Sequence, residues 1–315
     1  MEQIVIQRDF PIRRSELTCP GHSLKMATKA AASEPDEVIL DLEDACGLSQ
    51  KVAARATVIE ALSTLNWRGK LRAFRPNCLS TKFFYRDLIE VVEAAGRFVD
   101  VVVIPKVQAA QDVAFVDRLL TQIEQNVGLP VGRIRIEVLI ESAQAVIHAF
   151  EIATASPRLA SLIFGIADYA GDVGARDFTS EPFALFHYPK AKLLAAARAA
   201  GVAAIDNVTV QFRDAERCRD DAGRAAQLGF DGKWAIHPDQ VPIINGVFTP
   251  TGEEIARARE ILALYRQADL DAGLGAIVYQ DEMVDAATLR VEWKKLCIAR
   301  KAGLLPDDAP EKEQP

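Results

Sequence analysis

The sequence predicts an α/β fold: a closed (β/α)8 TIM barrel followed by a C-terminal helical extension. Short apolar runs rich in β-branched residues alternate with longer amphipathic segments, and eight such runs are present. Several of them, such as VDVVVIPK and IRIEVLIES, are apolar at consecutive positions. That pattern is typical of parallel strands buried on both faces. Eight strand–helix units favour a closed barrel over an open sheet.

The predicted strands follow one another at the spacing of strand–helix units. They cover residues 15–19, 37–42, 70–75, 99–104, 134–140, 161–166, 202–205 and 232–236. Amphipathic helices are predicted between them, most clearly over 50–65, 81–96, 109–127, 143–155, 184–200 and 213–228. Gly96 and Gly201 stand where these helices would end. The first and seventh strands have the weakest patterns, so an open α/β sheet is the structural alternative.

A different pattern follows the eighth strand. Residues 252–267 and 285–301 are predicted to be helical, and a Gly-rich link with a short apolar run covers 272–280. We therefore predict a catalytic barrel domain over 1–250 and a helical extension over 251–315. A barrel does not need such an extension to close, so it either packs on its own barrel or reaches a neighbouring subunit. The final PDDAPEKEQP is charged and Pro-rich and is predicted to be disordered.

Composition and charge narrow the partners and the location. The 315-residue chain has a net charge of −7 and no dense run of Lys and Arg, which makes nucleic acid an unfavourable partner. No stretch has the roughly 18 consecutive apolar residues that a membrane span requires, and the N-terminus lacks the apolar core of a signal peptide. The five cysteines form no CxxC pair, which argues against a disulfide framework and a structural zinc site. A cytoplasmic location is predicted.

Ionisable residues follow nearly every predicted strand, at the end of a barrel where catalytic groups lie. They are Asp41, Glu43, Asp44, Arg75, Lys106, Glu141, Asp168, Asp206 and His237. A ring of acids with one Arg and one Lys among them is a poor match to solvated strand ends. We interpret Lys106 as an ion-pair partner of one of these carboxylates, in preference to a Schiff-base lysine.

The crowded carboxylates predict a metal site. Carboxylates that lie close together repel one another unless a positive charge stands between them. Mg²⁺ prefers oxygen ligands and usually takes one or two carboxylates. We predict that Glu141 and Asp168, on neighbouring strands, bind Mg²⁺, and that Glu43 and Asp44 hold water molecules bound to the metal. With Arg75 beside it, such a site favours chemistry in which an oxyanion such as an enolate develops.

An ordered series of motifs identifies a family. The segments RSELTCPGHS, VILDLEDA, FRPN, VVVIPKV, EVLIESA, FGIADYA and GKWAIHPDQV resemble the citrate lyase β-chain and malyl-CoA lyase family, a group of metal-dependent HpcH/HpaI aldolases. The resemblance covers residues 13–300 and keeps the order of the motifs. It implies a (β/α)8 barrel whose C-terminal extension caps the active site of a neighbouring subunit, in a homotrimer or a hexamer.

The resemblance also implies roles for particular residues. Glu141 and Asp168 match the Mg²⁺ ligands, Arg75 matches the arginine that binds substrate and stabilises the enolate, and Glu43 and Asp44 match the supporting acidic pair. Asp285, in EMVDAATL, matches an acid/base aspartate that a neighbouring subunit supplies. Positions that hold substrate or coenzyme A are matched by Lys29, Ala167, Ile236 and His237.

The implied reaction is a retro-Claisen cleavage of a β-hydroxyacyl-CoA of the malyl-CoA, β-methylmalyl-CoA or citramalyl-CoA type. A base removes the hydroxyl proton, the carbon–carbon bond breaks, and a 2-oxo acid and the enolate of acetyl-CoA or propionyl-CoA are formed. Arg75 would stabilise that enolate, and Asp285 would protonate it.

Two departures from the family pattern bear on the acyl substrate. The region after FGIADYA is short, as in citrate lyase β-chains, and Thr18 and Ser23 replace the residues usual near the N-terminus. A citryl-CoA or citryl-carrier-protein lyase is therefore the nearest alternative. A subsequent thioester hydrolysis and a non-catalytic CoA-binding protein are further ones.

Overall fold

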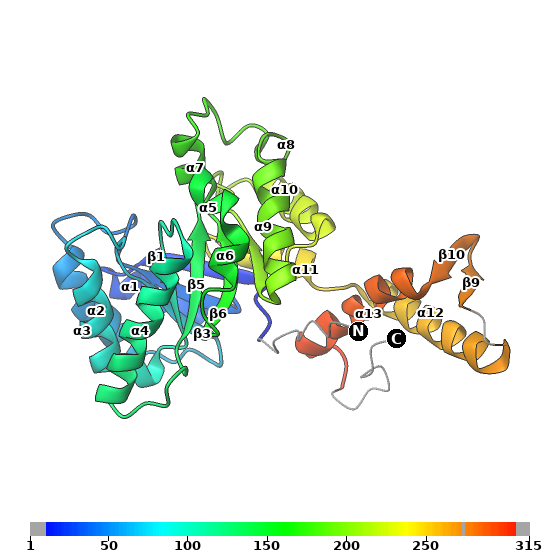
Figure 1. The fold of residues 1–315 in the computed structure, drawn as a ribbon, viewed down its shortest axis with the longest axis horizontal. Coiled ribbons are helices and arrows are strands. Elements are labelled where there is room, and N and C mark those ends of the chain that lie inside the picture. The colour runs from blue at the N-terminus through cyan, green and yellow to red at the C-terminus, as the bar shows by residue number, and fades with distance from the viewer. Residues whose placement is uncertain (1–10, 273–274, 307–315) are drawn as a thin grey trace. The chain divides into compact units, whose positions relative to one another are not determined.

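The computed structural model describes residues 11–272 and 275–306, and in it eight parallel strands form a closed barrel (Figure 1). The strands are β1 (Ser15–Pro20), β2 (Glu37–Asp41), β3 (Leu71–Arg75), β4 (Val101–Ile104), β5 (Arg135–Ile140), β6 (Leu159–Phe164), β7 (Ala203–Asp206) and β8 (Gly232–Ala235). Each pairs with the next in sequence, and β8 pairs with β1. The predicted barrel is confirmed, including the two strands with weak patterns.

Helices connect the strands on the outside. They are α1 (Leu24–Ala32), α2 (Lys51–Thr64), α3 (Phe84–Ala95), the short 3-10 helix η1 (Gly96–Phe98), α4 (Ala110–Asn126), α5 (Ala143–Ile147), α6 (Ala149–Ala153), α7 (Ile166–Asp172), α8 (Pro182–Leu185), α9 (His187–Ala200), α10 (Ala215–Leu228) and α11 (Gln240–Phe248). Gly201 ends α9 in the left-handed conformation with φ +68°, as its position predicts. Gly96 ends α3 with φ −55°, so the chain continues into η1 without a left-handed residue.

The predicted helix over 143–155 is wrong in one respect, because it is two helices. Backbone dihedrals of φ −95° and ψ 18° at His148 leave the α-helical range and end α5 before α6 begins. The sequence holds no Pro or Gly there to mark the break. The prediction also missed α1, whose N-terminus is capped by Ser23, the side chain of which accepts a hydrogen bond from the N–H of Met26.

The inside of the barrel is filled by apolar side chains from seven of the strands. They are Ile39, Ala73, Val101, Val103, Leu139, Ile163, Ile205 and Trp234, all buried. Successive strand residues point to opposite faces, so Val102 and Ile104, which are equally buried, face the helices. Burial on both faces explains why the strands read as continuous apolar runs.

Three glutamates form a buried group near the N-terminal ends of their strands, which we call the base cluster: Glu16, Glu37 and Glu137 with Arg13. Each of the four side chains is nearly or fully inaccessible to solvent. Arg13 Nε lies 2.6 Å from Glu137 Oε1 and 3.3 Å from Glu37 Oε2. Carboxylate oxygens of the three glutamates lie within 4.8 Å of one another. Glu16 faces them with neither oxygen hydrogen-bonded to any described residue.

The barrel closes where β8 meets β1. Ser15 pairs with Lys233, and the N–H of Lys233 donates to the carbonyl oxygen of Arg14 at 2.9 Å. Gly232 lies so close to the other strand that a Cβ placed on it would stand 1.8 Å from the carbonyl oxygen of Arg13. This position therefore requires glycine.

Packing divides the chain after Asn245, and the second unit has a core of its own. It contains α12 (Gly252–Ala272), the antiparallel strands β9 (Ala276–Tyr279) and β10 (Glu282–Asp285), and α13 (Ala286–Lys301). Their buried side chains are Ala258, Ile261, Leu262, Tyr279, Val284, Leu289, Leu296, Ala299 and Leu305. The prediction missed this hairpin, whose turn places Gln280 and Asp281 at φ +49° and +65°, a turn geometry usually marked by Asn-Gly.

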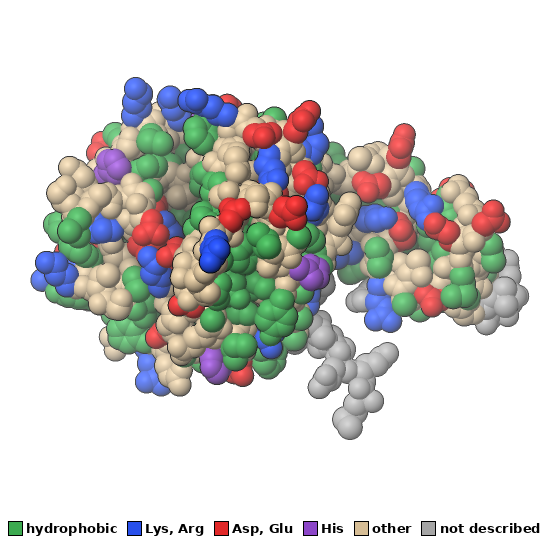
Figure 2. Space-filling model, turned by 90° about the horizontal axis from the view of Figure 1, so that it is seen from above, with side chains coloured by type: hydrophobic (Ala, Val, Ile, Leu, Met, Phe, Trp, Pro, Cys, Tyr) green, Lys and Arg blue, Asp and Glu red, His purple; other side chains and the backbone are tan. Residues whose placement is uncertain are grey.

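Two further sequence predictions concern the surface and the termini. No helix among the described residues is long and apolar enough to cross a membrane. Acidic and basic side chains are interspersed among apolar and uncharged ones on the face seen in Figure 2. The predicted disorder of PDDAPEKEQP concerns residues that, apart from Pro306, lie outside the described ranges.

Candidate active site

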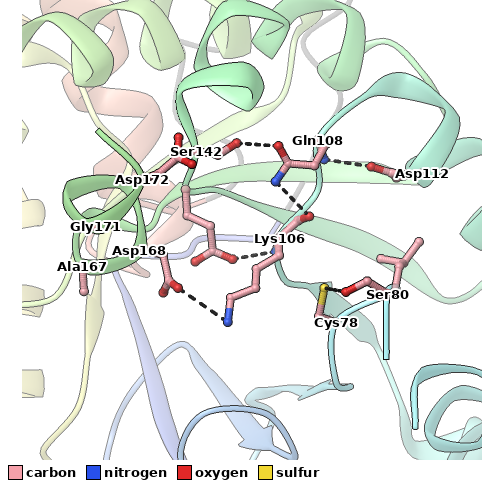
Figure 3. A pocket seen from close by; sticks show the side chains of 12 residues that line it. Cys78, Ser80, Lys106, Gln108, Asp112, Ser142, Ala167, Asp168, Gly171 and Asp172 are labelled. Carbon is pink, nitrogen blue, oxygen red and sulfur yellow. Dashed lines mark hydrogen bonds and ion pairs between the residues drawn. The ribbon is translucent and has the colours of Figure 1, made fainter. Parts of the chain in front are cut away.

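The C-terminal ends of the strands surround an open pocket of about 940 Å³. Its lining comes from the segments after β3, β4, β5 and β6: Cys78, Leu79, Ser80, Lys106, Gln108, Asp112, Glu141, Ser142, Ala167, Asp168, Gly171 and Asp172. Figure 3 shows Lys106 near the centre of this group, with its side chain directed toward Asp168. Of the ionisable residues predicted at the strand ends, the structure places Lys106, Glu141 and Asp168 in the lining, together with Ala167.

Arg75 lies beneath the pocket and is held by a bidentate ion pair. Its Nε and Nη2 donate to the two carboxylate oxygens of Asp41 at 2.7 and 2.6 Å. Asp41 also accepts the backbone N–H groups of Glu43 and Ala45, both at 2.8 Å. Burial alone would raise the pKa of the Asp41 carboxyl, but Arg75 and these donors hold the pKa below its ordinary value. Asp41 is thus the residue that orients Arg75, a role that sequence analysis did not assign.

Trp234 on β8 gives Arg75 a second support. The guanidinium carbon lies 5.3 Å from the centre of the indole ring, a cation–π geometry. The indole N–H in turn donates to the hydroxyl of Thr18 on β1. The planar arginine is therefore fixed by a carboxylate on one strand and a ring on another, which preorganises it.

Glu43 joins the two cations of the site. Its Oε2 lies 3.1 Å from Arg75 Nη1, and its Oε1 lies 2.8 Å from Lys106 Nζ. Burial raises the pKa of the Glu43 carboxyl, although both cations oppose the rise. Asp44 is more exposed and lies 3.5 Å from the same Lys106 nitrogen. The predicted acidic pair is therefore present at the mouth and contacts Lys106.

Glu141 is the most confined carboxylate of the pocket. Its Oε1 accepts the backbone N–H of Lys106 at 2.6 Å. Burial, then the charges of Asp168 and Glu43, raises the pKa of Glu141 to about 8. A Cβ on Gly165 would stand 2.6 Å from Glu141 Oε2, so the absence of a side chain at Gly165 leaves room for this carboxylate. This role of Gly165, which directly precedes IADYA, was not predicted from the sequence.

Lys106 contacts more of the site than any sequence argument indicated. Its Nζ lies 2.8 Å from Glu43 and 3.5 Å from both Asp44 and Asp168. Its backbone has φ +54°, which is uncommon for a residue with a side chain. The interpretation of Lys106 as an ion-pair partner of a mouth carboxylate is confirmed, and it has three such partners.

The donor set suits a hard divalent cation. Glu141 and Asp168 offer only oxygen, and Glu43 and Asp44 are held close by through Lys106. Burial, and after it the charges of Asp168 and Glu43, raises the pKa of Glu141, so an additional positive charge would favour its carboxylate form. Carboxylates with neighbouring space for water are the usual environment of Mg²⁺. The residues present therefore fit the predicted metal.

Of the residues predicted to hold substrate or coenzyme A, Ala167 lines the pocket, and Lys29, Ile236 and His237 do not. Lys29 is exposed in the last turn of α1. The N–H of Ile236 donates to Gln240 Oε1 at 2.9 Å, and the carbonyl oxygen of His237 accepts the N–H of Gln240 at 3.1 Å. The His237 ring stacks on Phe212 with centroids 5.1 Å apart. The structure thus brings Ile236 and His237 together in one turn after β8, and it does not bring Lys29 to the pocket.

Asp285 belongs to the second unit, where it caps α13. Its Oδ1 accepts the N–H groups of Ala287 and Thr288 at 3.0 and 2.9 Å and the hydroxyl of Thr288 at 3.1 Å. These hydrogen bonds, led by that of the Thr288 N–H, lower the pKa of Asp285. The capping role could be predicted from the spacing of Asp285 and Thr288 before a helix.

The chain is similar to known proteins over most of its length. The HpcH/HpaI aldolase/citrate lyase family model matches residues 14–238. The L-malyl-CoA/beta-methylmalyl-CoA lyase of Cereibacter sphaeroides is 41% identical over 292 residues, which are 88% of this chain and 91% of that protein.

Two solved structures are similar over nearly the whole chain. A citrate lyase from Burkholderia xenovorans LB400 has a TM-score of 0.83 at 25% identity and covers 98% of this chain and 97% of its own. The protein CitE of Mycobacterium tuberculosis, in complex with magnesium, acetoacetate and coenzyme A, has a TM-score of 0.75 at 28% identity, with coverage of 93% and 98%. The predicted resemblance and the prediction of a lyase are confirmed, and the chain belongs to the HpcH/HpaI aldolase/citrate lyase family.

Proposed function

We propose that this protein is a Mg²⁺-dependent lyase that cleaves a β-hydroxyacyl-CoA with one free carboxylate, of the malyl-CoA type, into an acyl-CoA and a 2-oxo acid. The observation that carries the proposal is that Glu141, Asp168 and Lys106 line one pocket, while Glu43 connects Lys106 to Arg75 directly behind it. Membership of a family with a malyl-CoA-cleaving relative supports the same reaction class. A non-catalytic CoA-binding protein would have no need to keep all of these groups.

Glu141 and Asp168 would hold the metal, and Glu43 and Asp44 would orient water around it. Bound there, Mg²⁺ supplies the positive charge that polarises oxygen atoms of the substrate. A magnesium complex of a similar structure supports this choice of ion.

Arg75 would stabilise the enolate that leaves when the carbon–carbon bond breaks. Its contacts with Asp41 and Glu43 use only part of the guanidinium, so further N–H groups remain for an oxyanion. Because the ion pair and Trp234 fix the guanidinium before substrate binds, little reorganisation would accompany the reaction.

The charges of the pocket favour a malyl-type over a citryl-type substrate. Four acidic side chains line the pocket: Asp112, Glu141, Asp168 and Asp172. Lys106 is the one Lys or Arg among the lining residues. A citryl thioester carries one more carboxylate than a malyl thioester, and that group would require a further cation. For this reason we favour a malyl-type substrate over the citrate lyase alternative.

We also propose that the second unit serves a neighbouring subunit of a homotrimer or hexamer and delivers Asp285. Val278 and Met283, which face each other across the β9–β10 hairpin, are 75% and 69% exposed, and a partner would cover them. Asp285 is the last residue of β10, and its hydrogen bonds favour the anion, the form that accepts a proton from the acyl-CoA in the condensation direction. The same group would return that proton in cleavage. A cytoplasmic location remains a prediction.

The proposed reaction is tested in the condensation direction. Glyoxylate, pyruvate and oxaloacetate are each offered with acetyl-CoA or propionyl-CoA, with and without Mg²⁺, and new acyl-CoA products are separated by chromatography. We expect a product from a monocarboxylic oxo acid only when Mg²⁺ is present. Turnover with oxaloacetate alone would favour the citrate lyase alternative, and no product from any pair would contradict the proposal. Release of free CoA would reveal thioester hydrolysis.

The shared site is tested by mixed oligomers. Glu141→Ala and Asp285→Ala subunits are co-expressed with different tags and purified through both tags. If Asp285 acts in a neighbouring subunit, some sites of the mixture are intact, and activity returns although each variant alone lacks it. Purified mixed oligomers without activity would contradict the shared site.

A further inference from the structure

We propose that Lys106 is a mobile counter-ion of the metal site: its ammonium pairs with the carboxylates of that site. It leaves them when Mg²⁺ binds and then holds the free carboxylate of the substrate. This inference rests on the proposed function, which it extends by naming the group that recognises the acid part of the substrate.

The first support is the position of the ammonium. Lys106 Nζ lies 2.8 Å from Glu43 and 3.5 Å from both Asp44 and Asp168 (Figure 3 shows the Asp168 contact). Glu43, Asp44 and Asp168 all belong to the set proposed to bind or support Mg²⁺. A divalent cation and an ammonium compete for the same carboxylates, because both are attracted to them and repel each other.

The second support is that the two halves of Lys106 are held differently. The backbone is fixed, with φ +54° and its N–H bonded to Glu141 at 2.6 Å. A residue with a side chain keeps such a conformation only when its surroundings determine it. The side chain, in contrast, is one-third exposed to the pocket. A fixed anchor with a long flexible stem lets the ammonium move within the pocket while its root stays beside Glu141.

The third support is that the pocket lining offers no second cation for a substrate carboxylate. Among the residues that line the pocket, Lys106 is the one with a cationic side chain. Two of the acidic lining residues accept hydrogen bonds from backbone N–H groups. Asp172 accepts the N–H of Ala143 at 2.7 Å. Asp112 accepts those of Gln108 and Ala109 at 2.8 and 3.1 Å. Arg75 lies behind Glu43 and does not line the pocket. An anionic substrate entering this acidic pocket therefore meets Lys106.

The contrasting role is that of a fixed strut, in which Lys106 holds Glu43 and Asp168 in the geometry that the metal needs. The two roles predict opposite changes in metal affinity. Removing a mobile counter-ion removes a competitor, so the metal binds more tightly. Removing a strut lets like-charged carboxylates move apart, so the metal binds more weakly.

The experiment is a titration of the purified full-length protein with Mn²⁺. Binding is measured by calorimetry and by the electron paramagnetic resonance signal of free Mn²⁺. It compares the wild type with Lys106→Met and Lys106→Arg, and with Lys82→Met as a control, since Lys82 is exposed outside the pocket lining. We expect Lys106→Met to lower the Kd for Mn²⁺ by at least about threefold. The Kd of the other two variants should stay within about twofold of the wild-type value. An unchanged or higher Kd in Lys106→Met would overturn the inference.

The second measurement separates substrate binding from turnover. With Mn²⁺ saturating and no acyl-CoA present, calorimetry measures the affinity for the 2-oxo acid that the enzyme condenses. We expect Lys106→Met to weaken this affinity about 10- to 100-fold, the usual effect of losing a charge-assisted hydrogen bond, and Lys106→Arg to restore most of it. Equal affinity in Lys106→Met and the wild type would overturn the assignment to the substrate carboxylate.

The two proposals fail in distinguishable ways. If the wild type binds no Mn²⁺, both the metal site and the role of Lys106 are wrong. If the wild type binds Mn²⁺ and catalyses condensation while Lys106→Met binds no more tightly, only the role of Lys106 is wrong.

Discussion

One barrel carries two groups of carboxylates, one at each end, and they meet the problem of mutual repulsion in different ways. At the mouth, Glu43, Glu141 and Asp168 stand around a pocket that solvent reaches, with Lys106 among them. At the other end, the base cluster places three glutamates around Arg13 with almost no access to solvent.

The difference teaches what access to solvent permits. An open group can take up a cation from solution, and the mouth accordingly offers only oxygen ligands beside a space. A sealed group cannot take up such a cation, so protons must neutralise the charge that Arg13 leaves unbalanced. Burial, followed by the neighbouring glutamates, raises the pKa of Glu16 and of Glu37 well above the ordinary value, and burial raises that of Glu137 as well. The same residue type thus serves binding at one end and packing at the other.

The largest expected effect separates the two ends by activity. Glu141→Ala and Asp168→Ala should each lower the rate of condensation more than about 10³-fold, because the positive charge at the reacting oxygens is lost. Circular dichroism and thermal unfolding should show a folded barrel in both variants. Glu16→Gln at the base is the control, and its activity should remain within about threefold of the wild type. Full activity in either mouth variant would remove the metal assignment.

The next effect tests whether Arg13 is required at the base. Arg13→Met removes the cation from three buried carboxyls, and breaking a buried ion pair costs about 3 kcal/mol of unfolding free energy. Urea denaturation at pH 7 measures the loss. Arg68→Met, which removes an exposed ion pair with Glu34, is the matched control and should change the unfolding free energy by less than about 1 kcal/mol. Equal stability of the two variants would show that the base cluster needs no cation.

A pH series tests the protons of the base cluster. A carboxyl whose pKa is raised by folding costs nothing below the ordinary value of 4.5, and it destabilises progressively as the pH rises from there toward the raised pKa. Glu16→Gln, which is neutral at all pH values, should match the wild type near pH 4.5 and exceed its unfolding free energy by about 1–3 kcal/mol at pH 8. The exposed Glu34→Gln serves as control. A constant difference between pH 4.5 and 8 would contradict retained protons.

The smallest expected effect distinguishes supporting residues from direct metal ligands at the mouth. Asp44 is 56% exposed and contacts Lys106 at 3.5 Å, so it supports the site from its rim. Asp44→Asn should weaken Mn²⁺ binding about tenfold, a typical loss for a residue behind the metal ligands. A loss as complete as that of Glu141→Ala would make Asp44 a direct ligand.

The sequence predicted the barrel because burial on both faces leaves a mark on every strand. It predicted the mouth because parallel strands in a barrel end at one face, so residues such as Glu141 and Asp168 converge whatever their separation in the chain. The base cluster was not predicted, because Glu16 and Glu137 meet across the inside of the barrel from strands that do not pair.

Other features depend on contacts at atomic distance. Arg75 makes a bidentate ion pair with Asp41 and a single contact with Glu43. The order of the strands does not determine this choice, which depends on the positions of the side chains. The space that Gly165 leaves for Glu141 is likewise set by a single backbone approach. The break at His148 has no local sequence signal, and the hairpin of the second unit turns on Gln-Asp where Asn-Gly is usual.

The seam between β1 and β8 has a consequence for the synthesis of the protein on the ribosome. The first strand emerges early, but Lys233, the partner of Ser15, emerges only after most of the chain has been made. At translation rates of about 5–20 residues per second, one edge of β1 waits tens of seconds with its backbone groups unpaired. Such an edge invites pairing with other nascent chains. A side chain at Gly232, which would collide with the carbonyl oxygen of Arg13, should prolong that exposure and increase the dependence of the nascent chain on chaperones.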